Sequence, residues 1–487
     1  MDFLESILRY HRVVIISVIF LSLFALIDRT LAIGVILFTF LVSVTLFFID
    51  KVKERETAKI LTLLFLIVFL IHALFVVAIH YTKFQPFSEG RGDFNEYHSV
   101  ARQISERVRS SNFSLKNFDE FPNLVNYYPV IVGYLYLLTT PNMLMGQLLN
   151  AWIVALIAIF IFFIVKELGR SEKEGLLVGL MAGVYPSLLF YGSLLLKDAL
   201  VVLLAIIGLL LSLKIIKNFS WKIFLIFYLT LIGTAHLRFY VAYALVLNFI
   251  IFWSIFSRLK IKNKIICLMI MIVLFGFLPF SALDGKTQGY MGLKAVNNFL
   301  NPQTIASYRD LALINQGQTM VSKTENDLLV VDNQIVAKYS LIAQDSSVRI
   351  DINFNNPVLF FKSIFLSFIY VVLGPLPWHL THKKHLFVLS EMITWYFLLF
   401  FIVRGIAKSI SKEYRIIFPV LFFSLLILGV LTFYMNNFGI VTRIRMPAFL
   451  ALLCLLPFGI PSEFSQKFFE NFKLFLSKLK IIKNLSI

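Results

Sequence analysis

The chain has 487 residues, of which 59% are hydrophobic, and its mean hydropathy is +0.84. Soluble domains are about 45–50% apolar, so this composition excludes a soluble enzyme and indicates an integral membrane protein. The formal net charge is +18, but the basic residues are spread over short loops rather than gathered on one face, which argues against nucleic acid as a partner. Cys267 and Cys454 both lie in apolar runs and provide neither a disulfide framework nor a metal cluster.

Apolar runs recur along the chain, and most have roughly the 20 residues that a helix needs to cross a hydrocarbon core of about 30 Å. Lipid provides no hydrogen-bond partner for the backbone, so such runs are expected to be helical. In chain order they cover residues 13–27, 31–49, 58–80, 143–165, 175–196, 199–216, 222–235, 239–257, 264–282, 357–376, 386–403, 414–434 and 447–461. The predicted fold is an all-α, polytopic bundle of about twelve transmembrane helices, with external amphipathic helices.

The positions of lysine and arginine predict the orientation of this bundle. Basic clusters occur at 51–55, 258–264 and 404–415 and in the tail after Phe464. Cytoplasmic loops carry such an excess of positive charge, so these clusters are expected inside the cell. Counting from both ends makes segment 357–376 begin and end on the same side, and its GPLPW ending favours a broken, partly inserted helix.

These features divide the chain into four parts. Two extra N-terminal transmembrane helices are expected in 1–57, a transmembrane core in 58–282 with its first external loop at 82–142, an external loop region in 283–356, and C-terminal helices with a cytoplasmic tail in 357–487.

The first external loop begins with acidic residues soon after a long apolar segment. Asp93, Glu96 and Tyr97 occupy positions i, i+3 and i+4, so a helix that starts here places them on one side. Ala101 and Ile104 continue the spacing, which predicts an amphipathic helix on the external surface. A carboxylate beside a bilayer can act as a base or a metal ligand, but Asp-x-x-Glu is also a capping pattern, and taken alone the pattern favours capping.

Two further polar groups fall at the external ends of apolar segments. Lys197 and Asp198 begin one helix, where Asp198 either caps the helix or faces the same site as Asp93, and Lys197 extends towards the interface. His236 and Arg238 lie on a short external turn.

Arg443 and Arg445 precede the last apolar segment. Their spacing of two predicts that an extended approach points both guanidinium groups the same way, ahead of a helix that begins near Pro447. Such a helix N-terminus suits a phosphate. External arginines run against the trend of positive charge inside, which favours a functional role, although interfacial arginines also bind anionic lipid headgroups.

Taken in order, these stretches resemble the GT-C superfamily of polytopic glycosyltransferases that use lipid-phosphate-linked sugars. In particular, they resemble the branch that is similar to bacterial relatives of the dolichyl-phosphate-mannose protein mannosyltransferases. The resemblance rests on the stretches GDFNEYHSVARQI, YYPVIVGYLYLL, MGQLLNAWIVALIAIFIFFIVKELG, VYPSLLFYGSLLLKDALVVLLA and GIVTRIRMPAFLALL. Two extra helices precede the family core, and Asp93 is not followed by a second acidic residue as in the protein mannosyltransferases.

The resemblance implies a membrane glycosyltransferase in which Asp93 is the catalytic base. It would transfer a sugar, with inversion, from a polyprenyl-phosphate donor to a glycan, lipid or protein acceptor on the extracytoplasmic face of the cell membrane. The other candidate site residues are Arg443, Arg445 and Arg238 for the lipid phosphate, Asp198 and Glu96 as second acidic groups, and Tyr97, Lys197 and His236 as substrate-lining residues. No cofactor is assigned, and a divalent cation, Mg²⁺ or Mn²⁺, held by Asp93 and Asp198 stays open.

Two other functions remain open from the residues. An O-antigen-type polymerase or ligase would move a whole glycan from a diphosphate lipid, and external arginines suit that reaction as well. A transporter of lipid-linked glycans would require ionisable residues within the spans. Most charges here fall at the ends of the apolar segments, which favours an enzyme.

Overall fold

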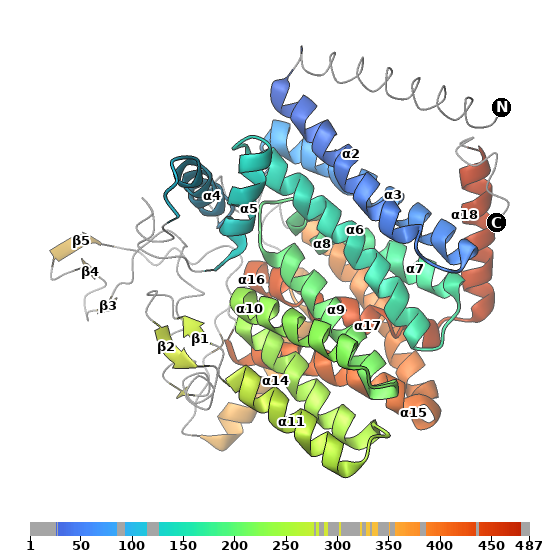
Figure 1. Cartoon of the computed structure of the whole chain (residues 1–487). Helices are drawn as coiled ribbons and strands as arrows, with labels where there is room; N and C mark the ends of the chain where they lie inside the picture. The colour runs from blue at the N-terminus through green and yellow to red at the C-terminus, as the bar shows by residue number, and fades with distance from the viewer. Residues whose placement is uncertain are drawn as a thin grey trace, which may run out of the picture.

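The computed structural model of the chain describes residue 26 and residues 28–84, 93–113, 126–276, 356–379, 386–434 and 438–478, together with short pieces between 279 and 350. Figure 1 shows a bundle of helices with small strands beside it. The helices are α2 (Arg29–Ile49), α3 (Arg55–Thr82), α4 (Asp93–Arg109), α5 (Tyr128–Leu138), α6 (Met143–Glu167), α7 (Glu172–Gly183), α8 (Pro186–Tyr191), α9 (Asp198–Lys217), α10 (Trp221–Phe256), α11 (Ile261–Gly276), α14 (Pro357–Leu373), η1 (Pro377–His379), α15 (Leu386–Tyr434), α16 (Phe438–Ile444), α17 (Met446–Leu453), η3 (Leu456–Phe458) and α18 (Ser462–Lys478).

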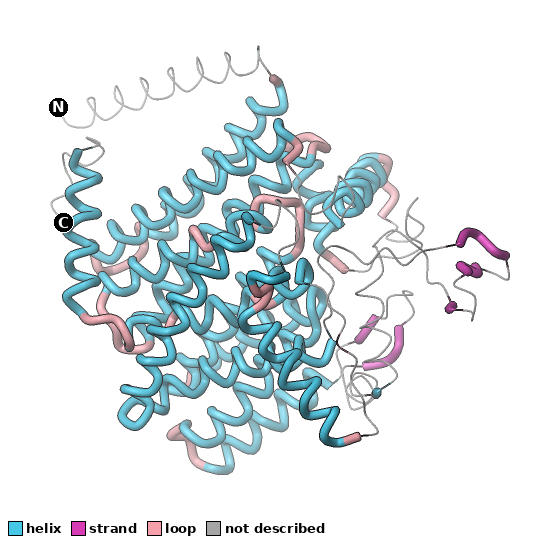
Figure 2. The backbone as a smooth tube through the Cα atoms, turned by 180° about the vertical axis from the view of Figure 1, so that it is seen from behind, coloured by secondary structure: helices cyan, strands magenta, loops and turns pink. Residues whose placement is uncertain are grey.

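Short strands occur in the region between α11 and α14. Strands β1 (Pro279–Ser281) and β2 (Thr287–Tyr290) pair antiparallel, as do β3 (Ser322–Lys323), β4 (Leu328–Val331) and β5 (Gln334–Lys338) in the order β3-β4-β5. The two small sheets, β1-β2 and β3-β4-β5, lie outside the helical bundle (Figures 1 and 2). The rest of the predicted external region 283–356, like most of the apolar run 13–27, lies outside the described residues.

Among the described residues, six helices are long and apolar enough to cross a membrane, or up to seven if the bent pair of α16 with α17 and η3 counts as one span. The expectation of an α-helical, multi-pass membrane protein is therefore confirmed. The count of about twelve spans is not. Part of the difference is that α10 and α15 each cover two of the predicted runs and are each counted once, and that α7 and α11 are shorter than the runs from which spans were predicted.

Helix α10 is a hairpin rather than one straight rod. The ring centroids of Phe227 and Phe249 are 4.9 Å apart, whereas a straight helix would separate these positions by about 33 Å at 1.5 Å per residue. The backbone breaks at Arg238, with φ −152° and ψ 94°. The two apolar runs 222–235 and 239–257 thus form two antiparallel arms with Arg238 at the tip.

Helix α15 folds back in the same way. On α17, Phe449 stacks on Trp395 with ring centroids 3.7 Å apart, and the neighbouring Ala448 carbonyl accepts a hydrogen bond from Ser424 Oγ at 3.1 Å. A straight helix would hold positions 395 and 424 about 43 Å apart. The break is at Glu413, with φ −119° and ψ 24°.

Several ion pairs lie at the two ends of this apolar bundle. Near the C-terminus of α9, Lys217 pairs with Glu167 at 2.9 Å, and the α15 tip residue Glu413 pairs with Arg170 at 3.5 Å. The opposite end of α9 carries Asp198, which lies against the α10 tip. The hairpins therefore place their tips at opposite ends of the bundle, and the Asp198 end contains the candidate site residues.

The predicted amphipathic helix is α4, which packs its apolar face on α5. Val100 and Ile104 are buried, with Val108 and Val130 packed against them. A Cβ atom on Gly133 of α5 would approach Ile104 to 2.8 Å, so the absence of a side chain there lets the two helices lie close together. This packing fixes the N-terminal turn of α4, which carries Asp93.

Gly459 provides a test of the α15 hairpin, because a Cβ atom there would lie 1.9 Å from the backbone oxygen of Phe401. Backbone cannot move aside as a flexible side chain can, so we expect Gly459→Ala to destabilise the protein by at least the ~1–3 kcal/mol typical of overpacking. A lower thermal unfolding temperature in detergent measures this. Gly429→Ala is the matched control, since nothing lies within 4 Å of its Cβ position. Equal melting temperatures for the two variants would contradict the close approach.

Candidate functional site

Four charged side chains from distant parts of the chain form one ion-paired row. Arg443 Nη2 of α16 donates a hydrogen bond to Asp93 Oδ2 of α4 at 2.9 Å. Arg443 Nε lies 3.2 Å from Asp198 Oδ2 at the start of α9. Arg238 Nη2, from the tip of α10, donates to Asp198 Oδ1. We call these residues the Asp–Arg row. The structure therefore brings Asp93, Asp198, Arg238 and Arg443 together, as the sequence analysis anticipated.

Asp198 joins the two arginines of this row. Its position in the first turn of α9 suits a carboxylate, because the helix dipole is positive there. The residue at the cap is Lys197, which makes no side-chain capping bond, so the alternative in which Asp198 caps the helix is not what the structure shows. The carboxylate instead bridges Arg238 and Arg443.

The row runs from the protein interior towards its surface. The side chains of Asp198 and Arg238 are 3% and 8% exposed, whereas those of Asp93 and Arg443 are 14% and 17% exposed. Asp198 and Arg238 thus form the buried end of the row. Asp93 and Arg443 are the more exposed members.

Several polar atoms of the row lack a hydrogen bond within the described part of the chain. Asp198 Oδ2 and Arg443 Nε are close enough for an ion pair but are not aligned as donor and acceptor, and Arg238 Nε also has no partner there. Buried groups without hydrogen bonds are rare, since each costs roughly 1–3 kcal/mol. Free guanidinium donors beside an accessible arginine are suited to an anionic ligand.

Lys197 adds a third positive charge to the site. Burial and the nearby Arg238 lower the pKa of Lys197 to about 8, with Asp198 acting in the opposite direction. The three cations Lys197, Arg238 and Arg443 face two carboxylates, which leaves a net positive site when Lys197 is protonated. Such a site attracts an anion.

A divalent cation does not fit this arrangement. The carboxylates expected to hold it, Asp93 and Asp198, are each paired with arginine, so a metal ion there would meet guanidinium groups at close range. Within the described residues, no group of three or more histidine, cysteine, aspartate or glutamate side chains is arranged to hold a metal ion. We therefore derive no chemical step through Mg²⁺ or Mn²⁺.

Tyrosine and asparagine side chains support the row from α4, α5 and α6. Tyr97 OH accepts a hydrogen bond from Asn126 Nδ2 at 3.4 Å, and burial, followed by the charge of Asp93, raises the pKa of Tyr97, which keeps its hydroxyl protonated. Asn150 accepts a hydrogen bond from Tyr128 OH at 2.9 Å. Its Nδ2 donates to the carbonyls of Leu194 and Leu196 at 2.7 and 2.8 Å. Asn150 thus fixes the segment that leads into Asp198.

The remaining predicted residues lie on the same elements or beside them. Glu96 is in the first turn of α4. The ring of His236 lies edge-on to Tyr127, with centroids 5.3 Å apart. Tyr240, which the sequence analysis did not select, accepts a hydrogen bond from Arg238 Nη1 at 2.9 Å.

Arg445 has a different environment from the one expected for a phosphate ligand. The predicted extended approach of Arg443 and Arg445 is wrong, because residues Phe438–Ile444 are helical. A spacing of two in a helix points side chains to nearly opposite sides. Arg445 is fully buried, and Nη1 donates to the carbonyls of Val371 and Gly374 at 3.0 and 2.6 Å.

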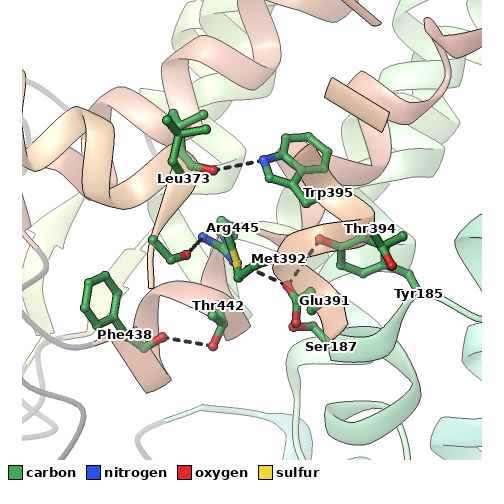
Figure 3. A network of polar contacts seen from close by, with 12 residues as sticks. Tyr185, Ser187, Leu373, Glu391, Met392, Thr394, Trp395, Phe438, Thr442 and Arg445 are labelled. Carbon is green, nitrogen blue, oxygen red and sulfur yellow. Dashed lines mark hydrogen bonds and ion pairs between the residues drawn. The ribbon is translucent and has the colours of Figure 1, made fainter. Parts of the chain in front are cut away.

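A buried glutamate completes the surroundings of Arg445 (Figure 3). Glu391 Oε1 accepts hydrogen bonds from Arg445 Nη2 at 3.3 Å and from Tyr185 OH at 3.1 Å, and Oε2 accepts one from Ser187 Oγ. This group was not predicted from the sequence. A signal was present, because Glu391 is a lone carboxylate in the apolar stretch LFVLSEMITWYF, and charges within membrane spans are rare and usually paired.

Comparison of the sequence with protein-family models and with curated proteins finds no match. The site is therefore interpreted from its own geometry and chemistry.

Asp198→Asn tests the central position of Asp198. It leaves the buried Arg238 without its counter-charge, while Arg443 keeps its pair with Asp93. We expect a loss of about 3–5 kcal/mol, the usual cost of breaking a buried ion pair. The measurement is thermal unfolding in detergent. The control Glu106→Gln alters an exposed pair with Arg102 and should change the unfolding temperature little. An Asp198→Asn protein as stable as the wild type would show that the row does not depend on this charge.

Proposed function

We propose that the protein is a membrane glycosyltransferase that takes a sugar from a polyprenyl-phosphate donor and transfers it, with inversion, to a glycan, lipid or protein acceptor. The observation that supports this most directly is the Asp–Arg row. A partly exposed carboxylate lies 2.9 Å from a partly exposed guanidinium group, which provides a proton acceptor and an anion binder side by side at one end of an apolar bundle. The resemblance to the GT-C superfamily agrees with this proposal.

In the proposed reaction, Asp93 accepts the proton of the acceptor hydroxyl group. The ion pair with Arg443 uses Oδ2 of Asp93, and we assign proton acceptance to Oδ1. As the proton leaves, the acceptor oxygen forms a bond with the anomeric carbon of the sugar. The bond from that carbon to the phosphate oxygen breaks on the opposite face, and its electron pair leaves with the lipid phosphate.

The leaving phosphate gains negative charge during this step, and fixed positive groups lower the energy of that change. Arg443 is the accessible guanidinium group, with Arg238 and Lys197 behind it. Asp198 holds both arginines in place. Arg445, which was also a candidate for the lipid phosphate, is fully buried and bound by carbonyls and Glu391, so we assign phosphate binding to the other cations.

We further propose that the reaction takes place on the extracytoplasmic side of the cell membrane. The basic segments 51–55, 258–264 and 404–415 adjoin helix ends opposite to Asp198, and such segments favour the cytoplasm. A polyprenyl donor then reaches the site from within the bilayer. The charge of the row also suits a diphosphate-linked glycan, the donor of an O-antigen-type polymerase or ligase.

Asp93→Asn tests the catalytic base. We expect a fall of about 10²–10⁴-fold in the rate of sugar transfer from a polyprenyl-monophosphate sugar, the usual contribution of general base catalysis. Purified protein in nanodiscs with radiolabelled donor measures this rate. Glu106→Gln, an exposed carboxylate on the same helix, is the control. Transfer by Asp93→Asn at the wild-type rate would refute this role of Asp93. If the wild-type protein used only a diphosphate-linked glycan as donor, the result would favour the polymerase or ligase.

Lys197 predicts a pH dependence of donor binding. A pKa of about 8 means that the amine is protonated below this pH and loses its charge above it. The charged groups around it are Asp93 of α4, Asp198 of α9, Arg238 of α10 and Arg443 of α16. We expect affinity for a polyprenyl phosphate to fall about tenfold as the pH rises from 7 to 9, when one charge-assisted hydrogen bond is lost.

Lys197→Arg is the control for this effect, because arginine stays protonated throughout this pH range. Its binding curve should be flat from pH 7 to 9, whereas Lys197→Met should bind weakly and without pH dependence. Equilibrium binding of a fluorescent polyprenyl phosphate in nanodiscs distinguishes these cases. The same pH dependence in Lys197→Met as in the wild type would exclude Lys197 as the titrating group.

A further inference from the structure

Arg443 and Arg445 belong to two different polar networks on either side of a helix bend. The axes of α16 and of the following helical segment, Met446–Phe458, differ by 48°. Arg443, just before the bend, reaches the Asp–Arg row. Arg445, at the bend itself, reaches the buried group around Glu391 in the bundle interior. We call this second group the Glu391 network.

The Glu391 network joins four parts of the chain at one guanidinium group (Figure 3). Arg445 binds the carbonyls of Val371 and Gly374 at the end of α14, and Glu391 belongs to the first arm of α15. Tyr185 and Ser187, at the start of α8, donate to the Glu391 carboxylate. Every one of these partners is fixed by neighbouring helices, so the backbone of Arg445 has little freedom to shift.

The Arg445 guanidinium group also packs against an aromatic ring. The Arg445 guanidinium carbon lies 4.5 Å from the ring centroid of Phe449, which in turn stacks on Trp395. Trp395 Nε1 donates to the carbonyl of Val372 at 2.9 Å. Arg445, at the bend, is thus held by its ion pair with Glu391, by hydrogen bonds to two backbone carbonyls, and by packing against the stacked rings of Phe449 and Trp395.

Helix α16 is also held by neutral hydrogen bonds from α8. It has seven residues, too short to be stable alone. Thr442 Oγ1 lies 3.3 Å from Tyr191 OH, which also donates to the Gly439 carbonyl at 3.3 Å. These neutral bonds are weak compared with the charge-assisted contacts of Arg443 and Arg445, so the position of the bend and the pairing with the two aspartates together determine the orientation of Arg443.

We propose that the Glu391 network positions Arg443 for the lipid phosphate, with Glu391 and Arg445 acting as positioning residues rather than contacting substrate. The proposal rests on the proposed function for the identity of the ligand, but not for the mechanical link from Glu391 to α16. A buried ion pair is weak evidence for a role in stability, since apolar side chains often do as well. A role in fixing geometry gives a reason for a buried ion pair at this position.

A double-mutant cycle separates positioning from general stabilisation. The measured quantity is the Kd for a fluorescent polyprenyl monophosphate in nanodiscs, for Glu391→Gln, Arg443→Ala and the double variant. We expect Glu391→Gln to raise Kd about tenfold in the wild-type background and less than twofold in the Arg443→Ala background. An equal increase in both backgrounds would overturn the proposal, because Glu391 would then act without Arg443.

Two further variants distinguish a specific effect on Kd from a general loss of stability. Ser187→Ala removes one donor to Glu391 and keeps both charges, so it should give the same pattern with a smaller change in Kd. Ser424→Ala is the matched control, because it removes a hydrogen bond between α15 and α17 at Ala448 without touching the Glu391 network. An increase in Kd with Ser424→Ala equal to that with Ser187→Ala would show that any loosening of α17 suffices, and would overturn the proposal.

A distance measurement tests the mechanical link without any lipid. Spin labels on Ile440→Cys of α16 and Arg109→Cys of α4 report the separation of the two helices. We expect Glu391→Gln and Ser187→Ala to broaden the distance distribution and Ser424→Ala to leave it unchanged. An unchanged distribution in Glu391→Gln overturns the positioning role. If Arg443→Ala binds the lipid as tightly as the wild type, the proposed function fails instead, and the distances still decide the positioning role.

Discussion

The cost of burying charge governs the arrangement of this protein. Arg238 and Asp198 are almost fully removed from solvent, and a buried guanidinium group without a counter-charge would cost several kcal/mol. Asp198 meets this requirement for two arginines at once, because its two oxygens face Arg238 and Arg443 separately. The positions of α9, α10 and α16 at this end of the bundle are therefore linked through one carboxylate.

The two helical hairpins explain how residues so far apart in sequence reach the same end. Because α10 turns back at Arg238, this residue comes level with the start of α9 while both arms remain in the apolar interior. Because α15 turns back at Glu413, at the opposite end, the chain returns towards the site before α16 begins. Each break carries a charged residue, which suits the end of a bundle better than its apolar middle.

Much of this arrangement could be predicted from the sequence, for physical reasons that particular residues illustrate. The apolar runs identify the helices, and the interruption HLRFY correctly marks the α10 turn. The helical spacing after Asp93 correctly indicates α4. The number of spans is not confirmed, because hydrophobicity does not show where a long apolar run breaks: the run 175–196 is divided between the short helices α7 and α8.

The buried environment of Arg445 could not be predicted from the sequence for a different reason. A spacing of two has opposite meanings in a strand and in a helix, and the short segment before Pro447 carries no clear signal for either. Once it is helical, Arg443 and Arg445 must point apart, so one arginine can reach the site while the other is buried behind it. Glu391, Val371 and Gly374 then become its partners, and these contacts span 54 to 74 positions of sequence. Two arginines whose spacing suggested a single phosphate site are thus divided between a partly exposed ion-paired row and a buried polar network.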